Sequence, residues 1–203
     1  VTTLTGTAAT ANTAYASNGI TGLGNEAVTI SDTSLATTVL NTLDGNTTGA
    51  VNAATVTTLT GTAATANTAY ASSGISGLGN EAVTLSDTSL ASSVLNTLDG
   101  NTTGVIDASA AHTLSGSVAN ANLVYGSNGF TGLGAEAVTL DDTSLGDVAD
   151  LNTLNGYTTG NVDASTITTL TGSISALNIA YAAGSALGNG ISGLGNEAVT
   201  LSD

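Results

Sequence analysis

The sequence predicts a β-rich repeat solenoid built from parallel strand–short-helix turns, with two turns in each tandem repeat. The first observation is the repetition itself, because residues 1–55 and 56–110 are identical at all but ten positions. The second is that apolar residues, 41% of the chain, recur at fixed positions of the repeat. A constant period of this length is typical of arrays in which each unit buries its apolar face on its neighbours.

The repeat divides the chain into four copies. Residues 1–55 and 56–110 are nearly identical, residues 111–166 diverge, and residues 167–203 form a partial copy with an insertion near Ala183–Gly188. We expect the four copies to form one continuous solenoid. Because the chain starts and stops inside the pattern, we also expect it to be a fragment of a longer array.

Strand and helix signals alternate within one copy. Glu81–Asp87 and Val105–Ser109 are short, rich in β-branched residues and bounded by Gly and Asn, so both are predicted strands. A helix is predicted after Ser86–Thr88, which are good N-cap residues. We expect Gly100 to end this helix in a left-handed C-cap. The apolar residues of the segment have helical spacing: Leu90, Val94, Leu95 and Leu98.

A second helix is predicted after Gly172–Ser173, where apolar residues recur at i, i+3 and i+7. These positions are Ile174, Leu177 and Tyr181, and the third copy has Val118, Ala121 and Tyr125 in the same columns. Four tyrosines share the last column: Tyr15, Tyr70, Tyr125 and Tyr181. We expect them to pack along a helix face with the hydroxyl at the rim.

Two interpretations of the turn remain open. Turns of roughly 24–31 residues with an apolar-x-apolar-Ser-x-x-x-Leu pattern resemble leucine-rich repeats, although the repeated Asn of that family is missing. The alternative is an all-β solenoid with three rungs per repeat, beginning in the first copy at Val1, Ile20 and Leu40. It is favoured by the many threonines, which suit strands better than helices.

The composition excludes several classes of function. The chain has no Lys or Arg and a formal charge of −15, so it lacks the residues that bind phosphate backbones or anionic membranes. It has no Cys, and no apolar run approaches the ~18–20 residues that span a bilayer. No signal peptide is visible. We therefore expect no nucleic-acid partner and no membrane insertion.

The sequence offers no recurring catalytic set, so we expect no enzymatic activity and no cofactor. His112 is the single histidine, and Thr2 and Thr57 stand in its column, which indicates a surface substitution. Ser and Thr abound, but no base recurs beside them. The repeated Gly-Leu-Gly has neither the spacing nor the Lys of a phosphate loop and predicts a tight bend.

Acidic residues fall into columns. We expect the glutamates Glu26, Glu81, Glu136 and Glu197 to be solvated, and the aspartates Asp32, Asp87, Asp142 and Asp203 to cap helices or turns. The alternative is a calcium site, since hard cations take carboxylate oxygens. Its candidates are Asp141, Asp142, Asp147 and Asp150, which form the one local acidic cluster.

Two further surface features carry functional hypotheses. Thr3-Leu4-Thr5 invites an ice-binding interpretation, but this Thr-x-Thr motif recurs once per repeat, whereas a ladder needs one per turn. Asn46 and Asn101 each begin an Asn-Thr-Thr sequon, which is a glycan acceptor in a suitable host.

The strings LNTLDGNTTG, VIDAS, VTTLTG, SGLGNEAVTLSD and AYASSG resemble the tandem repeats of very large surface or secreted proteins of marine cyanobacteria. The resemblance covers essentially the whole chain and implies a cell-surface, matrix or motility-related component. Residues 95–100, Leu-Asn-Thr-Leu-Asp-Gly, are also similar to the LNxLDG repeat of phage tail fibres. Neither family supplies catalytic residues for this chain.

Together these features predict a non-enzymatic structural repeat of an extracellular filament, sheath or surface layer. We expect the chain to self-associate along the solenoid axis at the cell surface, with surface glycans or ions as further contacts. A phage-type or adhesin fibre shaft is the alternative. A calcium-dependent or ice-binding solenoid is a third hypothesis.

Overall fold

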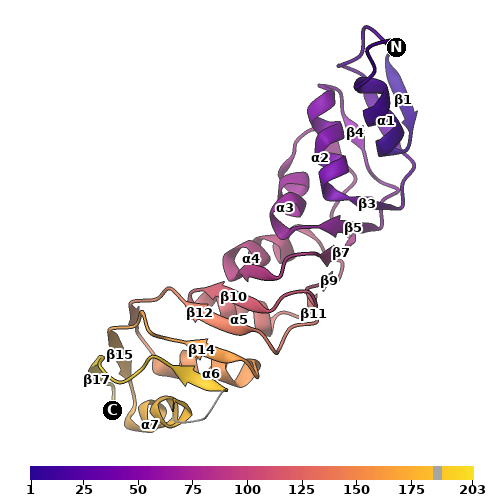
Figure 1. The fold of residues 1–203 in the computed structure, drawn as a ribbon. Coiled ribbons are helices and arrows are strands. Elements are labelled where there is room, and N and C mark those ends of the chain that lie inside the picture. The colour runs from indigo at the N-terminus through magenta and orange to yellow at the C-terminus, as the bar shows by residue number, and fades with distance from the viewer. Residues whose placement is uncertain (185–188) are drawn as a thin grey trace. The chain divides into compact units, whose positions relative to one another are not determined.

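The computed structural model describes residues 1–184 and 189–203. Within these ranges the chain forms seven helices and seventeen short strands that alternate along the sequence (Figure 1). The expected alternation of strands and helices is therefore confirmed. Residues 185–188, which make up most of the insertion expected near Ala183–Gly188, lie outside the described part of the chain.

The helices recur twice in each full repeat. They are α1 (Ala8–Tyr15), α2 (Thr37–Asn46), α3 (Ala63–Ala71), α4 (Ser92–Asn101), α5 (Val118–Gly126), α6 (Val148–Tyr157) and α7 (Ile174–Ala183). The all-β alternative is wrong, because Thr- and Ala-rich segments that it assigned to strands are helical. In α1, Thr7 caps the N-terminus and Ala8 and Ala11 bury one face, so packing and capping outweigh the weak helix propensity of Thr.

The chain divides into two compact units. The first contains Val1–Asp87 and Thr97–Ala108, and the second contains Thr88–Asn96 and Ser109–Asp203. In each unit the paired strands run parallel. Because hydrogen-bonded parallel strands need a crossover between them, the helices and loops of each turn supply that connection.

The first unit has strands in the orders β1-β2-β4-β6 and β3-β5-β7-β9. Their bounds are β1 (Thr3–Gly6), β2 (Ala27–Ile30), β3 (Ser34–Ala36), β4 (Val51–Asn52), β5 (Thr58–Gly61), β6 (Ile75–Ser76), β7 (Ala82–Leu85) and β9 (Ile106–Asp107). The strands predicted at Glu81–Asp87 and Val105–Ser109 are confirmed as β7 and β9.

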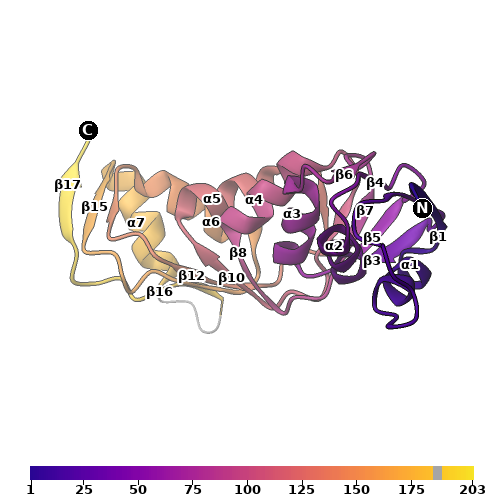
Figure 2. The same cartoon turned by 90° about the horizontal axis from the view of Figure 1, so that it is seen from above.

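The second unit has strands in the orders β8-β10-β12-β14-β16 and β13-β15-β17. Their bounds are β8 (Ser89–Ala91), β10 (Thr113–Gly116), β12 (Ala137–Leu140), β13 (Ser144–Leu145), β14 (Asn161–Asp163), β15 (Thr169–Gly172), β16 (Gly190–Ser192) and β17 (Ala198–Leu201), and β11 (Phe130–Thr131) also lies here. In this unit α5 and α6 lie along one side and β10 and β12 along the other (Figure 2).

The strand ladder advances by less than half of the sequence repeat at each step. Leu4 pairs with Val28, and Val28 pairs with Val51. Two steps of the ladder from Leu4 therefore reach Val51, whereas the equivalent of Leu4 in the second copy is Leu59. Leu59 pairs instead with Leu35, so each repeat begins a new sheet.

Helix α4 differs from the prediction at both ends. It begins at Ser92, because Ser89–Ala91 is strand β8, in which Leu90 pairs with Leu114 of β10. Backbone pairing with a distant strand has overridden the local helical spacing. Gly100 lies inside α4 and is not among the glycines with positive φ, so the expected left-handed C-cap is wrong.

The second predicted helix is confirmed as α7, with Ser173 at its N-cap. The hydroxyl of Ser173 accepts a hydrogen bond from the Ala176 N–H, at 3.2 Å. Thr7, Thr62 and Ser117 cap α1, α3 and α5 in the same way.

The core of each unit consists mainly of Val, Ile, Leu and Ala from the strands, the inward faces of the helices and the adjoining loops. The largest fully buried side chains are Ile30, Leu40, Leu43, Leu59, Leu95, Leu98, Ile106, Leu114, Leu140, Leu151, Leu154 and Leu170. Truncating one such side chain to Ala costs roughly 2–5 kcal/mol. The core thus follows the fixed apolar columns of the repeat.

Two nearby glycines should respond oppositely to alanine. Gly45 lies inside α2, where a Cβ would meet only open space, so Gly45→Ala should raise the free energy of unfolding by up to about 1 kcal/mol. A Cβ on Gly49 would overlap the backbone carbonyl of Glu26, so Gly49→Ala should destabilise the fold. Chemical denaturation of both variants tests this, and equal effects would contradict the close approach.

Candidate functional site

Three of the four recurring glutamates are buried, contrary to the expectation that they are solvated, and Glu197 is partly buried. Glu26 and Glu81 have 0% of their surface exposed, and Glu136 has 1%. A buried carboxylate is costly unless donors surround it. The repeated structure around each glutamate is therefore the strongest candidate site in the described chain.

The Gly-Leu-Gly bend supplies two of these donors. Gly22 and Gly24 have φ of 79° and 135°, which confirms the tight bend and requires glycine. The bend turns the N–H groups of Gly24 and Asn25 toward Oε2 of Glu26, at 2.7 and 3.1 Å. The motif thus binds the carboxylate of its own chain.

The tyrosine column supplies the third donor. Each hydroxyl donates to the glutamate of its own repeat: Tyr15 to Glu26 at 3.2 Å, Tyr70 to Glu81 at 3.0 Å, Tyr125 to Glu136 at 2.9 Å and Tyr181 to Glu197 at 2.9 Å. The four tyrosines are half-buried, and each hydroxyl is engaged by a glutamate. Apart from the two fixed columns, no signal in the sequence marks this pair.

A threonine and a glycine from the following turn complete the arrangement. Thr102 donates its hydroxyl to the backbone carbonyl of Glu81 at 2.8 Å, and Gly104 packs directly on that carbonyl. Thr47 and Thr158 do the same for Glu26 and Glu136. We call each set of Tyr, Glu, Thr and their glycines a tyrosine–glutamate cluster.

The surroundings shift the pKa of several members of the clusters. The Gly24 N–H is the main cause that lowers the pKa of Glu26, and its effect outweighs burial. For Glu197 burial acts most strongly and upward, but the Gly195 N–H and the other donors together lower its pKa. Burial is the main cause that raises the pKa of the Tyr70 and Tyr125 hydroxyls. Burial also raises the pKa of Tyr15 and Tyr181, the partners of Glu26 and Glu197, so these two clusters favour a carboxylate beside a neutral phenol.

The aspartate column caps helices, as expected, but each aspartate caps the helix of the preceding turn. The backbone N–H groups at the first helical residues donate to them: Ala8 to Asp32 at 2.8 Å, Ala63 to Asp87 at 2.8 Å, Val118 to Asp142 at 2.7 Å and Ile174 to Asp203 at 3.3 Å. A carboxylate at a helix N-terminus also interacts favourably with the helix dipole.

Helix asparagines link neighbouring helices. Their side-chain amides donate to backbone carbonyls of the next helix: Asn12 to Val39, Asn41 to Thr65, Asn96 to Asn120, Asn122 to Asp150 and Asn152 to Ala176. The sequon residues Asn46 and Asn101 use their amides on Asn12 and Asn67, each at 3.0 Å. These two amides are therefore engaged inside the fold.

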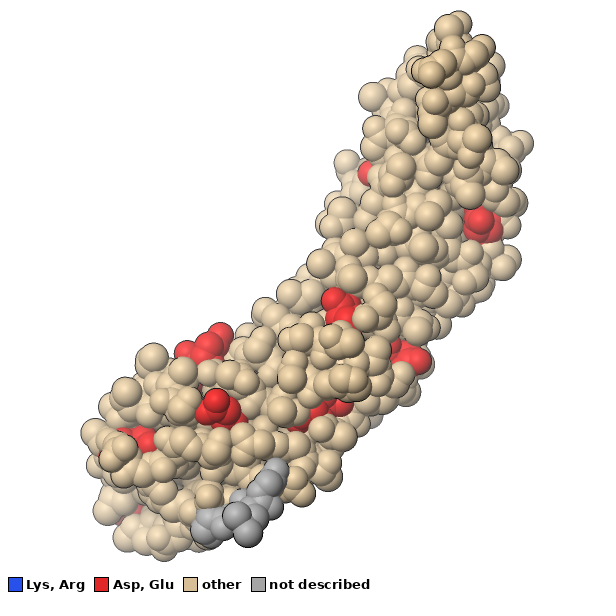
Figure 3. Space-filling model, viewed as in Figure 1, with Lys and Arg blue, Asp and Glu red and all other residues tan. Residues whose placement is uncertain are grey.

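The calcium candidates have separate positions and partners. Asp142 caps α5, and Asp147 caps α6 by accepting the Ala149 N–H at 2.9 Å. Asp150 lies in the first turn of α6, and Asp141 is exposed. In the described residues, no group of three or more His, Asp or Glu side chains is close enough to hold a metal ion. Acidic side chains form isolated spots on the face drawn in Figure 3.

The structure also places His112 and the Thr-x-Thr motif. His112 is exposed, in keeping with a surface substitution. The Thr-x-Thr motif pairs with Ala-x-Thr of the next turn, so Thr60 lies beside Thr84 and Thr171 beside Thr200. Threonine hydroxyls therefore lie side by side on two successive strands, although the motif itself occurs on only one of them. On the next strand Asp107 lies beside Thr84.

No family model matches the chain, and no curated protein and no solved structure matches it significantly. Among the described residues, no helix has the length and apolar character needed to cross a membrane.

Acid should destabilise the fold through the clusters. Because the pKa of Glu26 is lowered below its ordinary value of 4.5, its stabilising contribution is complete above that value and is lost as pH falls through the folded-state pKa. We expect Tm to be level from pH 7 to about pH 5 and to fall below it. Circular dichroism melts measure this, and Glu26→Gln should show a smaller acid-induced fall. A Tm that does not change down to about pH 2 would contradict the assignment.

A double-mutant cycle should show that Tyr70 and Glu81 act together. Tyr70→Phe removes a donor from a buried carboxylate and should lower the free energy of unfolding by about 1–2 kcal/mol. Glu81→Gln should also destabilise, since Oε1 of Glu81 is buried without a hydrogen-bond partner and an amide N–H there would lack an acceptor. In the double variant the two losses should not add, and strict additivity in urea denaturation would rule out the coupling.

Proposed function

We propose that this protein is a non-enzymatic structural repeat of an extracellular filament, sheath or surface layer. One observation carries the proposal: the recurring polar side chains make their hydrogen bonds inside the chain, and those of the Asp and Asn columns reach neighbouring turns. The Asp32 column caps preceding helices, the Asn12 column joins following helices, and the Glu26 column is enclosed in its cluster. What the repeat preserves is thus the contact between turns.

The finer architecture that we propose is a solenoid whose turns resemble leucine-rich-repeat coils. Its support is the parallel ladder between successive turns and the single helix in each turn. A repeat array of this kind gains stability from each interface between adjacent turns. Lengthening the array therefore adds stability without requiring a larger core in any one turn.

Strand β17 carries an apolar face that is buried in the equivalent strand of the second copy. In β17, Val199 and Leu201 are 45% and 54% exposed, whereas their equivalents Val83 and Leu85 in β7 are 1% and 3% exposed. This surface continues the interface that joins turns within the chain. We therefore propose that turns of the same kind stack on this face, and that the chain self-associates along the solenoid axis.

The composition supports a place outside the cell. The chain has no Cys or Met to oxidise and no Lys or Arg for trypsin-like proteases. The resemblance to tandem repeats of marine cyanobacterial surface proteins supports the same location. A phage-type or adhesin fibre shaft is the alternative, since it uses repeats of the same kind to space a binding tip.

Sedimentation velocity and electron microscopy test the self-association. We expect the mean mass to rise with protein concentration and chains of particles to form end to end. Val199→Thr combined with Leu201→Thr should reduce association, because it removes apolar surface from the proposed contact.

Thr200→Asn is the matched control, since Thr200 lies between these residues on the same strand and its side chain points to the opposite face. This variant should associate like the unmodified chain. Monomers at every concentration would overturn the stacking proposal. A concentration-independent trimer would favour the phage-type fibre instead.

A further inference from the structure

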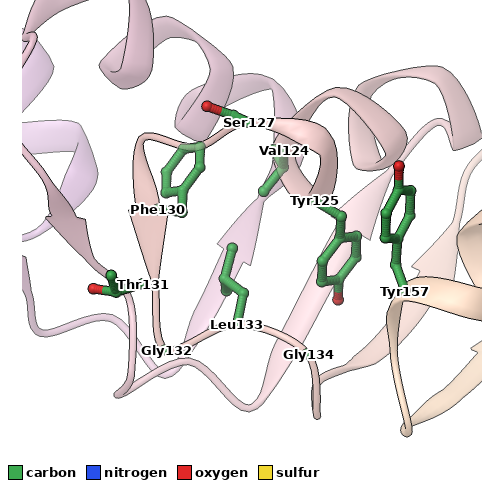
Figure 4. Close-up of a pocket in the computed structure, with 9 residues that line it drawn as sticks. All are labelled: Val124, Tyr125, Ser127, Phe130, Thr131, Gly132, Leu133, Gly134 and Tyr157. Carbon is green, nitrogen blue, oxygen red and sulfur yellow. The ribbon is translucent and has the colours of Figure 1, made fainter.

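The third repeat contains an aromatic cavity in the second unit. The cavity has a volume of about 170 Å³ and is lined mainly by Val124, Tyr125, Phe130, Leu133 and Tyr157. Leu133 lies between the rings of Phe130 and Tyr125, and Tyr157 lies on the other side of Tyr125 (Figure 4). The two tyrosine rings stack with centroids 5.7 Å apart and planes inclined by 15°.

Three of the six aromatic residues of the chain line this cavity. The sequence has five tyrosines and one phenylalanine, and four of the tyrosines form the structural column of the clusters. The two remaining aromatics, Phe130 and Tyr157, both line the cavity. Phe130 stands where the first two copies have Ile20 and Ile75. Tyr157 stands where they have Asn46 and Asn101.

The change to Tyr157 removes a structural hydrogen bond. In the first two copies the asparagine at this position donates to Asn12 or Asn67. In the third copy the corresponding acceptor, Oδ1 of Asn122, is buried without a hydrogen-bond partner. Leaving a buried acceptor without its hydrogen bond costs about 1–3 kcal/mol of folding free energy, so at this contact the change to Tyr157 does not stabilise the fold.

The chemistry of the cavity disfavours an anion and favours a ligand with a flat apolar face. The chain has no Lys or Arg to attract an anion, and the ring faces offer flat apolar surface. Tyr157 is 41% exposed, which leaves its ring accessible from solvent. The volume is below the roughly 300–1,000 Å³ of pockets that enclose drug-sized ligands, so the cavity suits a single ring.

We infer that this cavity binds one neutral sugar ring of an oligosaccharide. A sugar ring presents an apolar face that can stack on Tyr157 and hydroxyls that remain in water or bond at the rim. Among the lining residues, Thr131 has a hydroxyl and Gly132 and Gly134 contribute backbone, whereas the hydroxyl of Ser127 accepts the Gly129 N–H. The inference stands apart from end-to-end assembly, because every lining residue lies within the second unit.

Isothermal titration with cellohexaose, maltohexaose and xylohexaose tests the inference on the intact chain. We expect saturable binding of at least one of them with a stoichiometry of one. Tyr157→Asn and Phe130→Ile should each weaken it at least tenfold, which corresponds to about 1.4 kcal/mol. Both variants introduce the residue of the first two copies, so each should keep the fold.

Transfer of the site to the second copy gives the sharpest control. Ile75→Phe combined with Asn101→Tyr should raise the stoichiometry from one to two, because Tyr70 and Leu78 already occupy the positions of Tyr125 and Leu133. The inference is overturned if none of the three sugars binds saturably. It is also overturned if Tyr157→Asn and Phe130→Ile bind as tightly as the unmodified chain, or if only a planar aromatic probe such as 4-nitrophenol binds.

Discussion

The parallel backbone ladder between successive turns is the constraint on which the other contacts depend. It places each residue beside its counterpart in the next turn, as in the pairing of Thr58 with Ala82. That step brings Asp87 to the N-terminus of α3 and Thr102 to the carbonyl of Glu81. The side-chain bonds therefore use the same step as the strands, and one insertion or deletion within a turn would break several of them together.

The fold holds an excess of carboxylates without a single Lys or Arg. It does so with backbone N–H groups, which are available at helix N-termini and in the glycine bends. Ala8 donates to Asp32, and Gly24 donates to Glu26. Because backbone donors do not titrate, the stabilisation is lost mainly when the carboxylates themselves are protonated. This explains how a chain with a formal charge of −15 can bury part of that charge.

Residues that recur in every copy and residues that differ between copies have different roles in this fold. Columns that recur in every copy, such as the Tyr and Glu of the clusters, hold adjacent turns together. Phe130 and Tyr157 depart from the pattern, and both line the same cavity. In a tandem array, a copy that gives up a contact between its helices is the natural place to look for a role other than packing.

The sequence by itself determined the period, the alternation of strands and helices and the caps at Ser173 and the Asp32 column, because these depend on local chemistry and apolar spacing. Only the tertiary structure decided which helix each aspartate caps, why Leu90 lies in a strand and why Glu26 is buried. Those outcomes depend on partners 11 to 24 residues away, which local propensity does not encode. The cavity at Tyr157 was missed for the same reason, since its lining residues meet only after α5 and α6 pack together.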